Sequence, residues 1–565
     1  MRWSTPYSPE PETVQHLQDS LQIPTLIAHL LVQRGVKTYE QARLFFRPSF
    51  ADLHDPFLMK DMDKAVSRIE KAIAENERIL VFGDYDVDGT TSVALVYSYL
   101  KEFTPLVASY IPDRYLEGYG VSYKGIDFAA DNEMTLIIAL DCGIKSVEHV
   151  AYAQSKNIDF IICDHHLPGE IIPAAIAVLD PKQADCFYPY DELCGCGIGF
   201  KLIQALASRR NRPVESLVAY LDLVATAIAA DIVPITGENR VLAKLGMEQL
   251  NSNPRPGIKA LLQNRKKIQH TISDVVFGVA PRINAAGRIH HGETAVALLT
   301  QYNEEQAQEL AVEIEAHNNN RRELDQQITL EALQQIEDLA ETNRFSTVVF
   351  SESWHKGVIG IVASRLIENY YRPTVVFTRS GEYLAASARS VKGFDLYEAL
   401  EACSAHLIQF GGHKYAAGMT CHENQYPAFK AAFEAFVAAK MAPELREPEL
   451  EIDALIELAD LDPKVLRLLN QFEPFGPQNR TPVFRINGVY DTGFAKAIGS
   501  KNEHVKAFLK KGQSDGVGAV GFGLGNKLHL LQNRQLVDVV FSPEENEFGG
   551  KTTWQWRLKD VLAHS

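Results

Sequence analysis

The sequence predicts an α/β protein with a parallel-sheet domain and a smaller α/β domain joined by a long helix, followed by a small β-barrel. In the first half of the chain, apolar runs without polar alternation are separated by helical segments, which is typical of a parallel sheet covered on both faces. Near the C-terminus, short strands broken by glycine indicate a barrel of the oligonucleotide-binding type. The 565 residues exceed what one hydrophobic core usually serves, so we expect several domains.

The elements follow one another in a regular order. Residues 1–70 show helical spacing with turns at Pro48 and Pro56. The expected strands of the first sheet are 78–86, 135–143, 159–166 and 175–181, and the expected helices between them are 90–103 and 146–157. We therefore divide the chain into an N-terminal helical segment (1–70), a parallel-sheet domain (71–300), a connecting helix (301–342), a second α/β domain (343–441) and a barrel (450–565).

Three successive strands of the predicted sheet end in acidic residues. Ligands bind at the carboxyl ends of such strands. The residues found there are Asp84, Asp86 and Asp88, then Asp141, then Asp164, His165 and His166. Aspartates that cap helices and form turns could explain one such ending, but they do not account well for three.

A further aspartate interrupts an apolar helix at 221–234. Asp231 is costly to bury there unless it is paired or bound to metal. The long polar stretch at 303–342 reads as an extended helix with a weak point at its three consecutive asparagines, 318–320, and its apolar spacing drifts too much for a coiled coil.

Composition narrows the class of protein. The chain is 46% hydrophobic and 23% charged, which is ordinary for globular proteins. No apolar run approaches a membrane span, and the first residues, MRWSTPYSPEPETV, lack the apolar stretch of a signal peptide. We therefore expect a soluble cytoplasmic protein.

Seven cysteines argue against a disulfide framework, and we interpret Cys194 and Cys196 as small residues at the start of a packed helix.

The net charge of −16 does not decide the substrate. A protein that coats duplex DNA is usually basic. Clustered carboxylates that hold divalent cations, however, raise the negative count while they create a locally cationic site. An oxygen-rich set with one histidine favours Mn²⁺ or Mg²⁺. Two such cations, about 3.5–4 Å apart, would stabilise the crowded aspartates and suit the in-line hydrolysis of phosphate esters.

The motifs resemble those of the DHH phosphoesterase superfamily. DYDVDG, ALDCG, DHH and AADIVP appear in order, and GGHKYAAG is similar to the glycine-rich motif of the DHH-associated domain. The fuller pattern, with PDRYLEGYG, PRINAAGR, WHKGVIGIVASRL, ASARS and FEPFGPQNRTPVF, resembles the RecJ family of single-strand-specific 5′→3′ DNA exonucleases over residues 50 to 565.

The resemblance implies a ligand set for two cations. The implied metal ligands are Asp86, Asp88, Asp141, His165 and Asp231, with Asp141 as the bridging residue. Asp164 would orient His165, the neighbouring histidine, and His166 would face the scissile phosphate. Smaller relatives place a histidine ligand where this chain has Phe82, so one ion would be held more weakly or Asp84 would substitute; a structural cap is the alternative role for Asp84.

The resemblance also implies how a DNA end is held. Arg288, Ser387 and Arg389 would capture a 5′-terminal phosphate, since guanidinium groups match phosphate geometry. Arg114 would guard a channel too narrow for duplex, and Tyr119 would stack on a base. Arg282 and Asn284 would line the site from the PRINAAGR loop. The GGHKYAAG segment would bring Gly411, Gly412 and His413 close to phosphate.

The resemblance implies stepwise hydrolysis of single-stranded DNA from its 5′ end, with release of 5′-mononucleotides. The resemblance implies roles in recombination and repair, with a single-strand-binding protein and a RecQ-type helicase as partners, and we expect a monomer. Two alternatives stay open. One is a DHH phosphodiesterase of short oligonucleotides, although such chains are generally shorter and lack the barrel. The other is a non-catalytic binding protein on the same scaffold, although such proteins lose parts of the acidic set.

Overall fold

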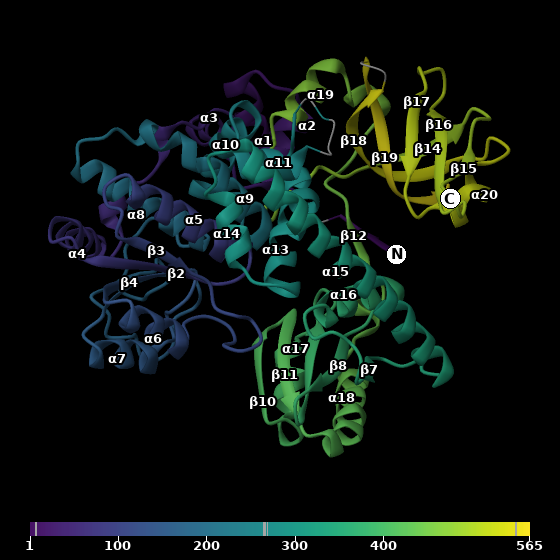
Figure 1. The fold of residues 1–565 in the computed structure, drawn as a ribbon. Coiled ribbons are helices and arrows are strands. Elements are labelled where there is room, and N and C mark those ends of the chain that lie inside the picture. Colours follow the sequence, from purple (N-terminus) through teal and green to yellow (C-terminus); the bar gives the residue numbers. More distant parts are fainter. Residues whose placement is uncertain (6–7, 264–266, 268, 549–550, 565) are drawn as a thin grey trace.

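Three sheets and a long helix organise the computed structural model (Figure 1), which describes residues 1–5, 8–263, 267, 269–548 and 551–564. The first α/β domain lies on the left of the view, the second at the bottom, and the barrel at the upper right. No helix among the described residues is long and apolar enough to cross a membrane.

The first sheet is five-stranded and entirely parallel, with the order β3-β2-β4-β5-β6. Its strands are β2 (Arg78–Gly83), β3 (Val107–Tyr110), β4 (Met134–Leu140), β5 (Asp159–Cys163) and β6 (Ala177–Leu179). Side chains of β2 alternate between two cores: Val81 packs on one face and Phe82 on the other. The predicted parallel sheet with covered faces is confirmed, and the short strand β3 was not foreseen.

Helices cover both faces of this sheet. They are α4 (Met62–Ala74), α5 (Val87–Lys101), α6 (Tyr123–Asp131), α7 (Val147–Ser155) and α8 (Gly195–Arg209). The core that contains α4, α5 and α8 continues into a helical layer. This layer consists of α9 (Leu221–Asp231), α10 (Gly237–Ser252), α11 (Pro256–Leu262), α12 (Ile272–Asp274), a π-helical turn (Val275–Val279), α13 (Ala280–Ile289) and α14 (Glu293–Leu299). The expected division at residue 70 falls inside α4.

A single helix, α15 (Glu304–Asp338), joins the two α/β domains. It continues without a break through the three asparagines, so the expected weak point is wrong. Asn318 is buried, and its side-chain oxygen accepts a hydrogen bond from Arg321 at 2.7 Å, which satisfies the amide inside the helix.

The second α/β domain holds a mixed five-stranded sheet with the order β10-β11-β9-β8-β7. Its strands are β7 (Thr347–Ser351), β8 (Thr374–Ser380), β9 (Tyr383–Arg389), β10 (Gln409–His413) and β11 (Ala416–Cys421), and its helices are α16 (Ile359–Asn369), α17 (Leu396–Ala402) and α18 (Tyr426–Lys440). One face packs on α17 and α18, and α16 and α15 pack on the other.

The third sheet is a partial ring of seven strands, closed by an additional pairing between β14 and β16. Its strands are β13 (Ala454–Leu455), β14 (Phe484–Asp491), β15 (Lys496–Ile498), β16 (His504–Lys510), β17 (Val517–Gly521), β18 (Val537–Phe548) and β19 (Lys551–Ala563). The helices α19 (Pro463–Asn470) and α20 (Leu528–Leu531) accompany it. The predicted barrel-like domain is confirmed.

The N-terminal helices pack on the barrel. They are α1 (Pro11–Leu21), α2 (Thr25–Gln33) and α3 (Tyr39–Phe46). Their apolar residues share one buried cluster with the barrel, and Phe45 stacks edge-on against Phe472. Further out, β1 (Arg2–Ser4) pairs in parallel with β12 (Glu449–Glu451), which precedes the barrel. The two ends of the chain thus build one structural unit.

A buried arginine connects this unit to the first domain. Arg240, on α10, donates hydrogen bonds to the backbone carbonyls of Phe45 and Phe472 at 2.9 and 3.0 Å. Its guanidinium also lies 3.6 Å from the centre of the Phe45 ring. Because carbonyl oxygens satisfy the buried charge, the contact fixes the barrel against the helical layer.

Candidate active site

Four neighbouring strands of the parallel sheet end in register, and an aspartate follows each of them. Gly83 pairs with Leu140, Leu140 with Cys163, and Cys163 with Leu179. The next residues along the chain are Asp84, Asp141, Asp164 and Asp180, and all four are buried. The register of the sheet therefore brings these carboxyl groups to one edge, as the sequence predicts for the first three.

The start of α5 adds two more carboxylates. Asp86 is the N-cap residue, and it accepts a hydrogen bond from the Gly89 amide at 3.0 Å. Asp88 is buried and points at the start of α8, where the amides of Gly195 and Cys196 donate to it at 2.6 and 2.8 Å. A helix N-terminus stabilises an anion in this way. Burial and the charge of Asp86 nevertheless raise the pKa of Asp88 to about 7.

His165 lies among three carboxylates from different elements. Its Nε2 atom is 3.2 Å from Asp141 Oδ1, 3.6 Å from Asp231 Oδ2 and 3.8 Å from Asp88 Oδ2. Burial and the neighbouring His166 lower the pKa of His165 to about 3, so the imidazole is neutral.

Several buried polar atoms of this centre have no hydrogen-bond partner. Both ring nitrogens of His165, Asp141 Oδ1 and Asp231 Oδ2 are buried and unpaired. Buried polar groups are normally satisfied, and clustered carboxylates repel one another. Burial and the surrounding carboxylates raise the pKa of Asp231 to about 8. Divalent cations would satisfy these atoms, and the set of oxygens with one imidazole fits Mn²⁺ or Mg²⁺.

Two backbone positions beside the centre are strained. Asp141 has φ 58°, and Ile232, directly after Asp231, has φ 62°. Left-handed backbone is unfavourable for residues other than glycine, and most unfavourable for a β-branched one such as isoleucine. Such strain concentrates at functional sites. Here one strained residue is Asp141 itself and the other directly follows Asp231, and both of these aspartates turn their carboxylates into the centre.

Phe82 and Asp84 bear on whether one ion lacks a ligand, and their side chains lie in different surroundings. Phe82 is buried in the second core and stacks on Tyr110, so it faces away from the acidic edge. Asp84 is fully buried; Oδ1 accepts a 3.4 Å hydrogen bond from the Gly120 amide, and Oδ2 has no partner. Among the described residues, neither Asp84 nor Asp86 belongs to a group whose ligand atoms all lie within 4.8 Å of one another.

Asp164 orients the second histidine of the DHH motif. Its Oδ1 accepts from the His165 and His166 amides and lies 2.7 Å from Nδ1 of His166. The expectation that it orients the ring of His165 is therefore wrong, because that ring turns toward the other carboxylates. Burial acts to lower the pKa of His166, but the hydrogen bond and charge of Asp164 outweigh it, so the pKa is raised. The Nε2 atom of His166 lies 3.2 Å from the hydroxyl of Tyr119, whose ring is exposed.

Three arginines from separate elements meet beside the acidic residues. Arg114 follows β3 and lies over the Tyr85 ring at 4.7 Å. Arg288, on α13, donates to the Gly357 carbonyl at 3.1 Å. Arg389, on β9, donates to Ser387 Oγ at 3.1 Å.

The charges of these arginines act on one another. Burial, and then the charges of Arg114 and Arg389, lower the pKa of Arg288 to about 10. None of the three forms an ion pair within the described chain. Mutually repelling guanidinium groups without carboxylate partners indicate a site for an anion, and both α/β domains contribute to it.

The PRINAAGR segment is helical, in α13, and the expected loop is wrong. The segment continues the π-helical turn, so its residues point in different directions. Arg282 forms an ion pair with Glu315 on α15 and donates to the Gly278 carbonyl, so its guanidinium is occupied away from the arginine cluster. Within the part of the chain that the structure describes, Asn284 makes no side-chain hydrogen bond to the other candidate residues.

The glycine-rich motif forms the hairpin of β10 and β11. Gly411 pairs with Gly418, which pairs with Ser387. His413 pairs with Ala416, which pairs with Arg389. Directly opposed residues share a face of a sheet, so Gly411 and His413 lie on the face of Ser387 and Arg389. A side-chain carbon added at Gly411 would meet open space.

The backbone conformation at Gly412 requires a glycine. It has φ 142°, and a Cβ there would lie 2.4 Å from the Ala416 carbonyl oxygen. A side chain at this position would therefore collide with the neighbouring strand, which explains the glycine.

Two residues of this site were not foreseen. Asp180 ends the fourth strand; burial raises its pKa to about 7, and its Oδ2 atom has no partner. The strand-end pattern could have revealed it. Gly195 starts α8, and a Cβ there would lie 2.6 Å from Cβ of Asp141. The expectation of small residues at a helix start is confirmed, since Cys194 is the N-cap residue of α8.

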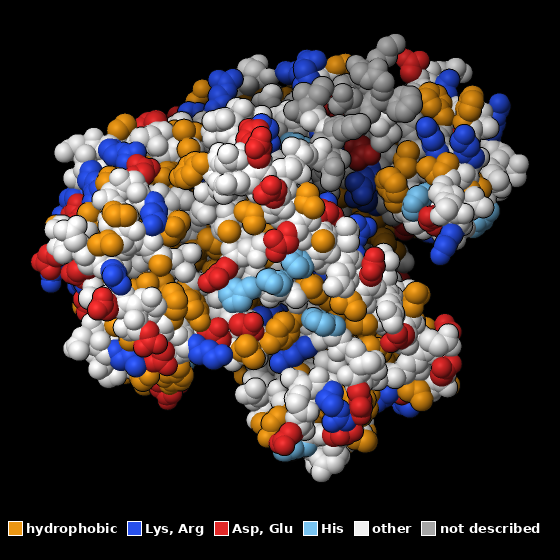
Figure 2. All heavy atoms as spheres, viewed as in Figure 1, with side chains coloured by type: hydrophobic (Ala, Val, Ile, Leu, Met, Phe, Trp, Pro, Cys, Tyr) orange, Lys and Arg blue, Asp and Glu red, His pale blue; other side chains and the backbone are white. Residues whose placement is uncertain are grey.

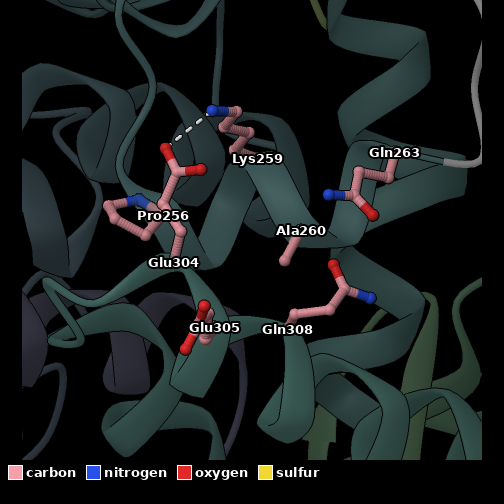
Figure 3. Close-up of a pocket in the computed structure, with 7 residues that line it drawn as sticks. All are labelled: Pro256, Lys259, Ala260, Gln263, Glu304, Glu305 and Gln308. Carbon is pink, nitrogen blue, oxygen red and sulfur yellow. Dashed lines mark hydrogen bonds and ion pairs between the residues drawn. The ribbon is translucent and has the colours of Figure 1, made fainter.

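A separate pocket of about 400 Å³ lies at α11 and α15 (Figure 3). Lys259 and Glu304 form an ion pair across it at 2.7 Å. None of the residues that line it is a candidate for the chemistry above, so its size does not mark the active site.

Comparison with known families agrees with this arrangement. The DHH family, N-terminal domain, matches residues 78–228; the DHHA1 domain matches 343–439; and the RecJ OB domain matches 452–560. Fold and site thus define a protein of the DHH class, with a DHHA1 domain and an oligonucleotide-binding domain.

Full-length relatives specify the family. The chain is 36% identical to the single-stranded-DNA-specific exonuclease RecJ of Bacillus subtilis, over 100% of this chain and 71% of that protein. It is 32% identical to the Escherichia coli RecJ, over 96% of each. The structure of Thermus thermophilus RecJ in complex with Mn²⁺ superimposes with a TM-score of 0.86 at 27% identity, over 100% of this chain and 80% of that one, and the complex with Mg²⁺ gives 0.80. The chain belongs to the RecJ family.

Proposed function

We propose that this chain is a metal-dependent, single-strand-specific DNA exonuclease that hydrolyses phosphodiesters from the 5′ end and releases 5′-mononucleotides in recombination and repair. The observation that carries the proposal is the cluster of Arg114, Arg288 and Arg389, which lack carboxylate partners among the described residues and lie beside the acidic centre. A terminal phosphate held there would present the first phosphodiester to the centre.

The ligands for two cations, Mn²⁺ or Mg²⁺, are proposed to be Asp86, Asp88, Asp141, His165 and Asp231, with Asp141 shared between the ions and Asp84 as a further ligand. When bound, these ions supply Lewis-acid polarisation of the phosphodiester and lower the pKa of water. The unpaired buried oxygens of Asp141 and Asp231 and the neutral ring of His165 support this assignment.

The protein's own groups would position the substrate. Asp164 holds Nδ1 of His166, and Nε2, which lies 3.2 Å from the Tyr119 hydroxyl, would exchange that partner for a phosphate oxygen; the raised pKa of His166 favours the charged, donating form. The exposed ring of Tyr119 is placed to stack on a base without regard to sequence. Ser387 would add a hydroxyl donor to the terminal phosphate beside Arg389.

The barrel would hold the strand further along. On its outer face, Phe508 and Lys506 alternate with buried residues of β16. Lys496, on β15, pairs with Lys506 on β16, and Arg557 lies over the ring of Phe522 at 5.3 Å. Aromatic rings between basic residues are typical of surfaces that bind single strands.

We also propose a cytoplasmic monomer that works with a single-strand-binding protein and a RecQ-type helicase. The two partners are assigned from the family resemblance.

The deciding experiment uses a single-stranded oligonucleotide with a 5′-phosphate and a label at the 3′ end. With Mn²⁺, we expect a ladder of labelled fragments that shorten from the 5′ end. The ladder should disappear with chelator and in Asp141→Ala, and persist in Asp191→Asn, an exposed control. Release of the label as a mononucleotide would instead show a 3′→5′ direction. Strand binding without cleavage would support a binding protein.

A second substrate tests the arginine cluster. Arg389→Gln should lose most of the preference for a 5′-phosphate over a 5′-hydroxyl, because the substitution removes a positive charge that is proposed to bind the terminal phosphate. Equal preference in the parent protein would contradict the assignment of the cluster to the terminal phosphate.

A further inference from the structure

A second cluster of metal-ligating side chains lies outside the acidic centre. His290 is the C-cap residue of α13, and Glu313 and His317 lie one turn apart on α15. One ligand atom from each of the three lies within 4.8 Å of the other two. Figure 2 shows histidine side chains, in pale blue, gathered near the middle of the face where α13 and α15 lie in Figure 1.

The three side chains of the cluster lie close to one another. The His290 and His317 rings are stacked, with centroids 5.1 Å apart and planes 18° from parallel. Nε2 of His317 lies 3.6 Å from Glu313 Oε1. That nitrogen is buried and has no hydrogen-bond partner, although the residue itself is partly exposed. Within the described chain, this histidine is also the only ion-pair partner of Glu313.

The donor set differs in kind from the acidic centre. Two imidazole nitrogens and one carboxylate form the His₂Glu set that binds zinc, whereas Mg²⁺ and Mn²⁺ prefer oxygen. Four-coordinate zinc at about 2.0–2.1 Å from its ligands places them about 3.3 Å apart. Rotation of the exposed His290 and Glu313 side chains can close the remaining distance. Water would complete the coordination.

We propose that His290, Glu313 and His317 form a separate site for one borderline divalent cation, Zn²⁺ by preference. The ion would join the end of α13 to the middle of α15. Arg288 lies two residues before His290, so the ion would brace the helix end that carries this arginine. Glu315, on the same stretch of α15, already pairs with Arg282 on α13, which leaves the metal site as a second connection between the two helices.

The test measures zinc binding apart from activity. The full chain carrying Asp141→Asn, in millimolar Mg²⁺, is titrated with Zn²⁺ by calorimetry. We expect one tight site per chain that weakens at least tenfold in His317→Ala and in His290→Ala, and persists in His422→Ala, a histidine of the second α/β domain. Glu313→Gln should weaken binding less than either histidine variant.

Cobalt provides a second measurement. Co²⁺ in the site should give visible absorption of four- or five-coordinate intensity, which His317→Ala abolishes. Equal unfolding temperatures in chelator would show that the variants are folded.

Unchanged zinc affinity in both histidine variants would overturn the proposal, as would the absence of any tight site in the parent. Because the readout needs no DNA, failure here is distinguishable from failure of the exonuclease assignment.

Discussion

At the scale of single residues, Gly195 has the most demanding position. A methyl group there would collide with Asp141, and the Gly195 amide is a donor to Asp88. We expect Gly195→Ala to lower exonuclease turnover at least tenfold, or by about 1.4 kcal/mol in activation free energy, and to weaken Mn²⁺ binding. Steady-state assays across Mn²⁺ concentrations would measure both.

Gly199 is the matched control. It lies one turn further along α8, where an added Cβ would make ordinary contacts at 3.4 and 3.6 Å with Val96 and Leu140. Alanine is favoured over glycine inside a helix by roughly 0.5–1 kcal/mol, so Gly199→Ala should retain activity. Equal losses in both variants would show that α8 tolerates no methyl group at all, and would remove the specific role of Gly195.

The buried carboxyls should make the metal-free protein less stable as the pH rises. The pKa values of Asp88 and Asp231 are about 7 and about 8, above their ordinary 3.8. A raised pKa in the folded state means that the stability is fully present below the unfolded pKa of 3.8 and is lost progressively until the pH passes the folded pKa. In chelator, the unfolding temperature should therefore fall by a few degrees between about pH 4 and about pH 8, and change little above that.

Cations should reverse this trend. Mn²⁺ should raise the unfolding temperature more at the upper end of that range, because the ligands are then deprotonated. Asp231→Asn should flatten the profile, and the exposed Asp191→Asn should not. A flat profile in the parent protein would mean that these carboxyls ionise freely in the folded state.

At the scale of elements, the outer face of β16 is the clearest functional surface. Phe508 is 39% exposed between Lys506 and Lys510. Stacking contributes roughly 1–3 kcal/mol per base, so Phe508→Ala should weaken binding of a long single strand about tenfold. Turnover of a trinucleotide, too short to reach the barrel, should not change. Phe187→Ala, an exposed phenylalanine of the first domain, is the control, and an equal effect on both substrates would contradict the assignment.

The elements also show what local sequence can and cannot reveal. The strand ends were predictable because apolar runs stop directly before Asp84, Asp141 and Asp164, and parallel strands end at one edge. Strand β3 was missed because its four residues lack a long apolar run. The PRINAAGR segment was misassigned because its proline stands at the start of α13, where a missing amide has no cost.

The directions in which the site's side chains point could not be predicted from the sequence. That His165 turns toward the carboxylates while His166 turns toward Asp164 depends on the path of the chain after β5, which no spacing encodes. The ion pair of Arg282 with Glu315 likewise joins elements whose relative placement is a tertiary property.

At the scale of the whole molecule, one buried carboxylate fixes the second domain to the connecting helix. Asp325, on α15, is fully buried and accepts two hydrogen bonds from Arg365 on α16. Removing this carboxylate would leave the guanidinium groups of Arg365 and Arg321 without their shared partner. We expect Asp325→Ala to loosen the two domains and reduce exonuclease activity severalfold, because Ser387 and Arg389 would no longer be held beside Arg288.

Hydrogen exchange measures this loosening directly. Amides of α16 should exchange faster in Asp325→Ala, while those of β4 keep their protection. Glu352→Gln, which alters an exposed pair with Arg379, should change neither. Full protection of α16 in Asp325→Ala would show that apolar packing alone holds the domain.

The shared core of the N-terminal helices and the barrel sets the order in which a nascent chain can fold. Phe45 and the other apolar residues of α1–α3 pack against partners from Ile456 onward, about 400 residues later. At a synthesis rate of about 5–20 residues per second, these helices leave the ribosome tens of seconds before their partners exist. The first domain can complete its sheet in that interval, so the earliest part of the chain to be made is among the last to be buried.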